Sequence, residues 1–232
     1  EDLVAGRVPP KKLYVFANCF ALTDADRSAI AHQCTAKTAV FLYANGLLDR
    51  TVDARNMEAL LGVPLVLSRQ RIGGECEPVS HPLTRGVSTF GVEEITPVIS
   101  LARPGGLPAA TELLATYKAN GQPAAWKHMG DMTTIYIGAL AVPAALLRNI
   151  AATAGVHLYA EAGDVVEANE HFVALHAARA GEKRFGLPRS AEVRDALTRR
   201  VIGDTIASWS VTMEKGETRL FSIAYRENAP RP

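Results

Sequence analysis

Two buried-strand patterns, each followed by a helix pattern, constrain the fold of the N-terminal part of this chain more than any other feature. Residues 13–17 and 38–43 are continuous apolar runs, typical of strands that are covered on both faces. Thr23 and Asp26 have the spacing of a capping box, which predicts a helix start, and a second helix is expected over residues 53–61. This alternation predicts a mostly parallel sheet with right-handed crossovers and helices on both faces.

Turn signals change the expected pattern further along the chain. Residues 69–97 are rich in Gly, Pro and Thr and are expected to form a loop. The Asn-Gly pair at 120–121 favours a tight hairpin turn between residues 113–117 and 124–128. We therefore expect these segments to extend the sheet with antiparallel strands at one edge. A helix over 143–154, which starts at a proline and stops at a glycine, would close this domain.

The last third of the chain has an all-β pattern. After Gly155 the sequence shows only short strand-like runs separated by turn residues, and Trp209 begins an alternation of apolar and polar residues. This pattern predicts a small antiparallel β-sandwich. The expected organisation is a linker from a preceding domain over residues 1–12, an α/β domain over 13–158 and a small all-β domain over 159–232.

Charge and composition exclude several classes of partner. The formal net charge of +1, from 25 basic and 24 acidic residues, provides no field that would gather nucleic acid or anionic lipid. The longest apolar stretch, 135–147, is interrupted by Pro143 and is too short to span a membrane. Three cysteines without a CxxC pair favour a reducing compartment, so a cytoplasmic protein is expected. The start at Glu1 indicates processing or excision from a longer polypeptide.

The sequence offers few candidates for catalysis. A thiolate nucleophile needs a nearby histidine and an exposed turn between a strand and a helix, but the best such turn, residues 43–46, contains no thiol. The three cysteines lie elsewhere and are expected to be small core side chains: Cys19, Cys34 and Cys76. His171 and His176, the closest histidine pair, would point to opposite faces of a strand. We therefore assign no catalytic residue, no metal site and no cofactor.

A ligand of the α/β domain would bind in the crevice outside the carboxyl ends of the parallel strands. The residues expected at that crevice are Asn18, Phe20, Asn45 and Arg103. The asparagines have a second interpretation, in which they only cap the turns that hold them. Trp126 and Trp209 are candidates for stacking on a sugar or for an interface, and burial in the core is the alternative for both.

Five stretches of the chain resemble a known group of enzymes. Residues 12–23 (KLYVFANCFALT) and 38–46 (TAVFLYANG) resemble the amidotransferase-like trimerisation domain that follows the catalytic barrel in β-galactosidase-type glycoside hydrolases. Residues 146–159 look like the end of that domain, and residues 169–176 and 216–221 look like the small β-domain after it. The resemblance covers nearly the whole chain. It implies a flavodoxin-like or class I amidotransferase-like α/β domain followed by the small β-sandwich.

The resemblance also implies an accessory role. In that family the catalytic residues lie on a preceding (β/α)₈ barrel, which needs roughly 200 residues or more, whereas only a short lead-in precedes Leu13. No catalytic residue of the family can be carried onto this sequence. The implied function is a non-catalytic, oligomerising region, whose partners are a barrel of the same polypeptide and copies of itself, as a trimer. Two alternatives stay open: a stand-alone amidotransferase-like or Cys-dependent hydrolase that uses Cys19 or Cys76, and a carbohydrate-binding module that uses Trp126 or Trp209.

Overall fold

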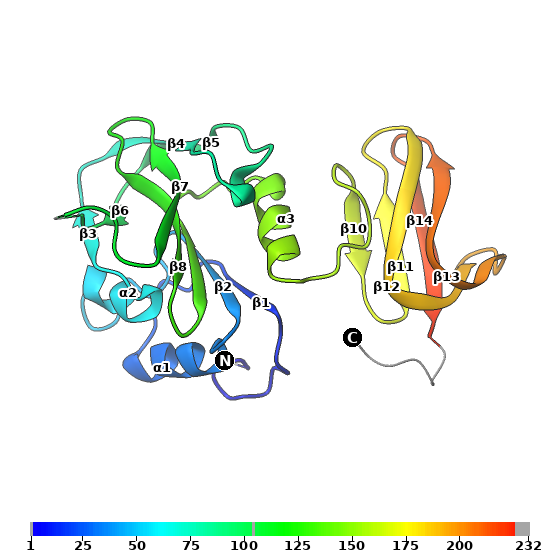
Figure 1. The fold of residues 1–232 in the computed structure, drawn as a ribbon, viewed down its shortest axis with the longest axis horizontal. Coiled ribbons are helices and arrows are strands. Elements are labelled where there is room, and N and C mark those ends of the chain that lie inside the picture. The colour runs from blue at the N-terminus through cyan, green and yellow to red at the C-terminus, as the bar shows by residue number, and fades with distance from the viewer. Residues whose placement is uncertain (1, 104, 226–232) are drawn as a thin grey trace. The chain divides into compact units, whose positions relative to one another are not determined.

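The chain is divided into two structural units (Figure 1). The computed structural model describes residues 2–103 and 105–225. The N-terminal unit covers Glu1–Val156 and the C-terminal unit covers His157–Pro232. Each unit has its own cluster of buried apolar side chains, so each forms a hydrophobic core of its own.

A seven-stranded mixed sheet forms the framework of the N-terminal unit, with the strand order β1, β2, β9, β8, β7, β4, β5. Its strands are β1 (Leu13–Phe16), β2 (Thr38–Leu42), β4 (Ile72–Pro78), β5 (Phe90–Ile95), β7 (Thr111–Tyr117), β8 (Pro123–Met129) and β9 (Thr133–Ile137). The β1–β2 and β2–β9 pairs are parallel, and the other four neighbouring pairs are antiparallel. Parallel pairing is therefore confined to one side of the sheet.

The predicted α/β fold, flavodoxin-like or class I amidotransferase-like with a mostly parallel sheet and helices on both faces, is wrong. The described residues form fourteen strands and only three α-helices, which are α1 (Asp24–Gln33), α2 (Ala54–Leu61) and α3 (Ala144–Thr153). The alternation of strands and helices holds only through α2. Beyond it, the expected loop over 69–97 contains β4 and β5. A Cβ atom on Gly91 would lie 2.2 Å from the Gly74 carbonyl oxygen, so glycine lets these two strands pair closely.

The hairpins predicted from the turn signals are present but lie in the middle of the sheet rather than at its edge. β7 pairs with β8 and β8 with β9, both antiparallel, while β9 also lies beside β2. The edges of the sheet are β1 and β5. Two further strands, β3 (Leu65–Ser68) and β6 (Val98–Leu101), pair antiparallel in a separate two-stranded sheet.

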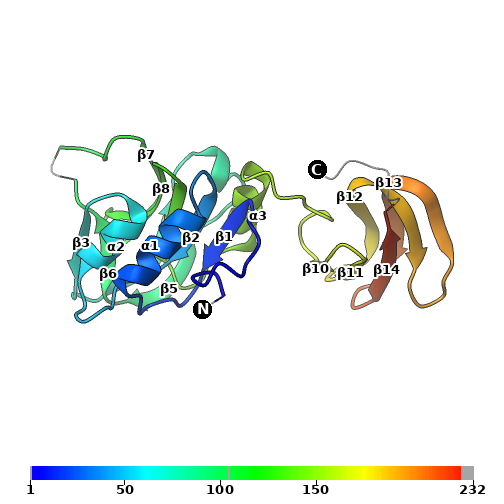
Figure 2. The same ribbon diagram turned by 90° about the horizontal axis from the view of Figure 1, so that it is seen from below.

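The helix ends follow the local sequence signals. Thr23 and Asp26 form the predicted capping box of α1, and Asp53 caps α2 by accepting a hydrogen bond from the backbone N–H of Arg55. Gly62 ends α2 in the left-handed region, with φ of 71°. α1 and α2 pack side by side (Figure 2). In the described part of the chain, no helix has both the length and the apolar character that crossing a membrane requires.

The C-terminal unit is one five-stranded antiparallel sheet, with the strand order β10, β11, β14, β12, β13. Its strands are β10 (Val165–Ala168), β11 (Phe172–His176), β12 (Gly181–Asp195), β13 (Val201–Met213) and β14 (Thr218–Ala224). The expected sandwich of two sheets is replaced by this single sheet. The long β12 pairs with β13 along its length and with β14 near its end, and register shifts between Gly186 and Arg194 mark bulges, which bend a strand. The rings of Phe185, Trp209 and Phe221 meet in its core.

A buried ion pair ties β12 to the segment before β10. Lys183 Nζ lies 2.9 Å from Asp164 Oδ2, and the two side chains are only 10% and 9% exposed. Asp164 Oδ1 also accepts a hydrogen bond from the backbone N–H of Ala178. The hydrogen bond from the Lys183 ammonium is the main cause that lowers the pKa of the Asp164 carboxyl. The negative charge of Asp164 is thus balanced by the Lys183 ammonium of the same unit.

Candidate functional site

Asn45 lies where the first two parallel strands end, and both the oxygen and the nitrogen of its side-chain amide hydrogen bond to the backbone. The residue is 1% exposed. Its Oδ1 accepts a hydrogen bond of 2.7 Å from the backbone N–H of Cys19, and its Nδ2 donates to the carbonyls of Phe16 and Leu42. Because both amide hydrogens and the oxygen have partners, Asn45 joins the ends of β1 and β2 and offers no group to a ligand.

The surface beside Asn45 is apolar. Phe20, Leu48 and Val52 are 43%, 39% and 47% exposed. They lie on short paired segments, because Leu48 bridges both Ala21 and Val52, and the Leu48 N–H donates to the Phe20 carbonyl. We call Phe20, Ala21, Leu48 and Val52 the apolar ledge. Its chemistry suits contact with another apolar surface rather than catalysis.

The other two residues predicted at the crevice do not join Asn45. Asn18 is exposed and has a φ of 60°, which fits an asparagine in a turn. Arg103 is exposed and follows β6, which belongs to the two-stranded sheet. It therefore does not follow a strand of the seven-stranded sheet, because the parallel pattern that placed it there ends at α2. The structure brings together Asn45 and the segment around Cys19 and Phe20, but not Arg103.

The cysteines lack the surroundings of a nucleophile. Cys34 and Cys76 are fully buried, and burial raises the pKa of the Cys34 thiol to about 11 and that of the Cys76 thiol to about 12. Cys19 is half-buried, and its Sγ lies 3.6 Å from the Ala17 carbonyl oxygen. Within residues 2–103 and 105–225, no hydrogen bond joins a cysteine to a histidine. The geometry thus provides no activated thiol.

Both tryptophans are core residues. Trp126 is fully buried on β8 and stacks on Tyr136, with 4.2 Å between ring centroids. Trp209 is 9% exposed and stacks on Phe185 at 4.8 Å. Stacking on a sugar requires an exposed ring face, which Trp126 lacks and Trp209 has already given to Phe185.

The part of the chain that the structure describes contains no cluster of metal-binding side chains. No group of three or more His, Cys, Asp or Glu side chains there is placed to hold a metal ion. His176, one of the closest histidine pair, has its Nδ1 2.8 Å from Thr218 Oγ1 on the neighbouring strand. His176 thus contributes a side-chain contact between the paired strands β11 and β14.

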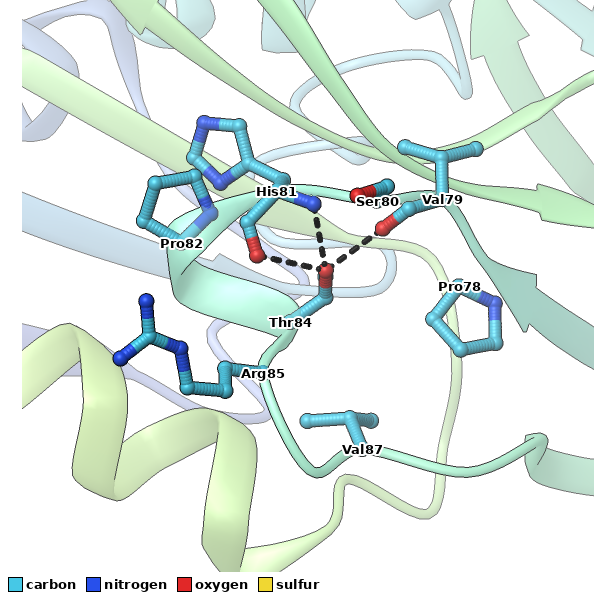
Figure 3. A pocket seen from close by; sticks show the side chains of 8 residues that line it. All are labelled: Pro78, Val79, Ser80, His81, Pro82, Thr84, Arg85 and Val87. Atoms are coloured by element: carbon cyan, nitrogen blue, oxygen red, sulfur yellow. Dashed lines mark hydrogen bonds between the residues drawn. The ribbon is translucent and has the colours of Figure 1, made fainter.

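A surface recess of about 500 Å³ lies along the loop between β4 and β5 (Figure 3). Figure 3 shows the Thr84 hydroxyl hydrogen bonded to the backbone of Val79 and His81 within this loop. The loop contains the short 3-10 helix η1 (Pro82–Thr84), and Asn149 of α3 donates to the carbonyls of Leu83 and Arg85. These bonds hold the recess in a defined shape.

Both ring nitrogens of His81, the histidine of this recess, have hydrogen-bond partners. His81 Nδ1 accepts from the Leu83 N–H at 3.0 Å, which leaves Nε2 to face Glu112 Oε2 at 3.3 Å. Glu112 Oε2 accepts a hydrogen bond of 2.8 Å from Lys127 Nζ. This hydrogen bond is the main cause that lowers the pKa of the Glu112 carboxyl, and the hydrogen bond with His81 lowers it further. The recess therefore has no free base. The signal for this loop in the sequence is a cap pattern, with His81 before a proline and Thr84 three residues later.

No protein-family model matches this sequence, and no curated protein is significantly similar to it. Its fold, in contrast, is similar to that of several solved structures. A β-galactosidase from Bacillus circulans sp. alkalophilus has a TM-score of 0.63 and 15% identity, over 92% of this chain and 33% of that chain. Gan42B, a GH42 β-galactosidase from G. stearothermophilus, has a TM-score of 0.57 and 14% identity, over 92% and 32%. A β-galactosidase from the psychrophilic Marinomonas ef1 has a TM-score of 0.54 and 13% identity, over 91% and 29%.

These similarities concern the fold of a part of those enzymes. The chain spans about a third of the length of the β-galactosidases it matches. More than nine tenths of the chain is covered, so the match includes residues of both units. At 13% to 15% identity the match shows a shared fold, and the chain has the fold of a β-galactosidase segment of this length.

Proposed function

We propose that this chain is a non-catalytic accessory region of a β-galactosidase-like glycoside hydrolase and acts in carbohydrate metabolism together with a catalytic barrel. The observation that carries the proposal is the match of 92% of this chain to a third of a β-galactosidase. The barrel is proposed as a further part of the same polypeptide, since the remaining two thirds of those enzymes offer ample length for one.

The carboxylate chemistry supports the non-catalytic part of the proposal. Glycoside hydrolysis uses a pair of carboxyl groups, one of which acts as an acid with a raised pKa. Six carboxyl groups in residues 2–103 and 105–225 have a clearly displaced pKa, and in all six it is lowered, mainly by hydrogen bonds from nearby donors. They are Asp26, Asp53, Glu112, Asp164, Asp195 and Glu217. A lowered pKa suits a structural carboxylate and not a general acid.

An activity measurement tests this proposal. The purified full chain is incubated with an aryl β-galactoside, and release of the aryl group is followed. We expect no release above that of a heat-denatured sample of the same preparation. Turnover at an enzyme-like rate of about 1 s⁻¹ or more would contradict the proposal. If such turnover were lost in Cys19→Ser, a thiol-dependent hydrolase would replace the non-catalytic proposal.

We also propose that the parent enzyme self-associates through the apolar ledge, as the trimer that the family resemblance implies. Three large apolar side chains of the ledge are exposed on segments that hydrogen bond to one another. Grouped exposed apolar side chains favour an interface, whereas scattered ones need no explanation. A net charge of +1 offers little electrostatic resistance to association of identical chains.

A further inference from the structure

A recess of about 350 Å³ lies at the ends of α1 and α2, and no role described above uses it. This volume is within the range of small-molecule sites. Its lining joins the last turns of both helices to the turn between β8 and β9. His128 of β8 and Thr134 of β9 are paired, so both side chains lie on the same face of the sheet, and Thr134 Oγ1 donates to the Leu61 carbonyl at 3.1 Å. α2 therefore ends over that face, and we call this space the helix-end recess.

His128 offers an acceptor nitrogen to the recess. The Thr111 hydroxyl donates its single hydrogen to the Ala109 carbonyl, 3.2 Å away, and His128 Nδ1 lies 3.0 Å from the same hydroxyl oxygen. Both contacts are satisfied when Nδ1 carries the imidazole hydrogen and donates it to Thr111. In the neutral ring Nε2 then holds a lone pair, and no described residue hydrogen bonds to it.

Two glycines leave this nitrogen uncovered. A Cβ atom on Gly62 would lie 3.2 Å from His128 Nε2, and a Cβ atom on Gly130 would lie 3.5 Å from it. Gly62 has the left-handed conformation that ends α2, so the helix end accounts for this glycine. The φ of Gly130 lies outside the left-handed region, so the backbone there does not require glycine. The missing side chain at Gly130 keeps the Nε2 edge of His128 open to the recess.

Other polar side chains of the recess also have accepting capacity left. The Thr35 hydroxyl donates its hydrogen to a carbonyl of α1 at 3.1 Å, and the Thr134 hydroxyl donates to α2, so lone pairs remain on both oxygens. The carboxylate of Asp131 only accepts. His32 is the exception, because a neutral imidazole keeps one N–H. A ligand of this recess must therefore supply donors.

The charges of the lining favour a cation. α1 and α2 both present their C-terminal ends, which carry partial negative charge. Asp131 is exposed and adds a full negative charge, and the described lining contains no lysine or arginine. Lys12 and Lys37 line a neighbouring recess that shares Asp131, but neither forms an ion pair with it in the part of the chain that the structure describes. The lining itself is thus negative when its histidines are neutral.

We propose that the helix-end recess binds a small organic cation, a primary ammonium group on a short alkyl chain. An ammonium carries three N–H donors and a positive charge, which match a negative lining of acceptors. It donates to His128 Nε2, and its alkyl chain contacts apolar side chains of the lining, Ala31, Ala59 and Met132. A metal ion fits less well, since no group of three or more His, Cys, Asp or Glu side chains in the described residues is placed to hold one. The proposal does not depend on the accessory role, because it uses only the N-terminal unit.

Nuclear magnetic resonance of the histidine rings tests this site in the full chain. The chain has six histidines, and the His128 signal is identified by its loss in His128→Gln. The probe is n-butylammonium, and n-butanol and butyrate are neutral and anionic molecules of similar length. Each is added at constant pH and ionic strength to about 50 mM, well above a weak Kd of roughly 1 mM. We expect a saturable shift of the His128 signal with n-butylammonium, and binding of the other two that is weaker by about tenfold or more, because they lack the charged donor.

Two variants with matched controls locate the site. Gly130→Ala should raise the Kd for n-butylammonium about tenfold or more, because its methyl group covers His128 Nε2. Gly73→Ala is its control, since Gly73 also has room for a methyl group but lies on β4 and does not line the recess. Asp131→Asn should raise the Kd about threefold, the size of an exposed charge interaction. Its control is Glu93→Gln, an exposed carboxylate on β5.

Both controls should bind like the wild-type chain, and circular dichroism of each variant checks folding. The proposal is overturned if n-butylammonium gives no saturable shift of the His128 signal. It is also overturned if n-butanol or butyrate binds as tightly, or if Gly130→Ala and Asp131→Asn bind like their controls.

Discussion

The end of the parallel strands in the N-terminal unit and the turn before β13 both carry polar side chains, but only the turn has one, Arg200, without a side-chain partner among the described residues. The Asn45 amide has partners for both of its hydrogens and for its oxygen, all of them backbone groups. Arg200 lies just before β13, has no side-chain hydrogen bond or ion pair among the described residues, and lines a surface recess of about 480 Å³. A polar side chain near a turn can thus stabilise the turn or serve a ligand, and the difference lies in its remaining hydrogen-bonding capacity.

The two units also differ in how they join distant segments. The N-terminal unit uses the neutral amide of Asn45, and the C-terminal unit uses the ion pair of Asp164 and Lys183. Removing one partner of the ion pair leaves a charge without its counter-charge, whereas removing the amide leaves only unpaired backbone dipoles. Mutation of the ion pair should therefore reduce stability more than mutation of Asn45.

Lys183→Met should have the largest effect. We expect it to lower the free energy of unfolding of the C-terminal unit by about 3 to 5 kcal/mol, because the Asp164 carboxylate stays buried without its partner. Urea unfolding followed by Trp209 fluorescence, in a Trp126→Phe background, measures this unit. Arg184→Met, on the same strand but exposed, should cost less than about 1 kcal/mol. Equal effects of the two changes would contradict the charged bridge.

The same ion pair predicts a pH dependence. The pKa of Asp164 is lowered in the folded state, so its stabilisation is complete above the unfolded value of about 3.9 and is lost as pH falls through the folded value. The difference in unfolding free energy between wild type and Lys183→Met should therefore shrink below about pH 4. Urea unfolding repeated from pH 7 to pH 2.5 measures it. A difference that stays constant over this range would show that Asp164 does not carry the effect.

Asn45→Ala should come next, with a loss of about 3 kcal/mol in the N-terminal unit, since three hydrogen bonds at roughly 1 kcal/mol each are removed. Trp126 fluorescence in a Trp209→Phe background reports on this unit. Asn18→Gly is the control, because Asn18 is exposed in a left-handed turn, and a change within about 0.5 kcal/mol is expected. If Asn45→Ala were as mild as its control, Asn45 would not join the strand ends.

A smaller effect is expected from the apolar ledge. Phe20→Ser combined with Leu48→Ser should weaken self-association of the full chain at least tenfold, because each side chain contributes about 1.5 kcal/mol or more when buried. Sedimentation velocity over a range of concentrations measures the association. Val66→Ser, also exposed and apolar but on β3, should leave it unchanged. A wild-type chain that stays monomeric at every concentration would remove the ledge as an interface.

Alkylation of the thiols should have the smallest effect on the protein. In the folded chain iodoacetamide should modify Cys19 well before Cys34 or Cys76, whose thiols are fully buried and have raised pKa values. Mass spectrometry of peptides gives the rate at each site. Labelling of Cys76 as fast as Cys19 would show that its burial is not persistent.

Local signals in the sequence predicted local structure well. Thr23 with Asp26, Gly62 and the Asn-Gly turn at 120–121 each satisfy backbone groups or backbone conformations within a few residues, and the structure has the expected cap, helix end and hairpin there. These outcomes need no information from elsewhere in the chain.

Features that depend on pairing between distant segments could not be predicted from the sequence. β9 pairs in parallel with β2 across more than ninety residues, and the two glycines that let β4 and β5 approach look like loop residues in the sequence. Arg103 was misplaced for the same reason, since the strand before it pairs with β3 instead of entering the main sheet. The recess that Arg200 lines also forms only in the folded unit, because residues of β13 and β14 line it together.

The size of the native polypeptide tests the central claim most directly. An antiserum raised against this 232-residue chain is used on extracts of the source cells, and the precipitated protein is assayed on an aryl β-galactoside. The account predicts one band longer than this chain by roughly 200 residues or more, the length of a catalytic barrel, with activity in the precipitate. A band of the 232-residue length without a larger form would contradict it.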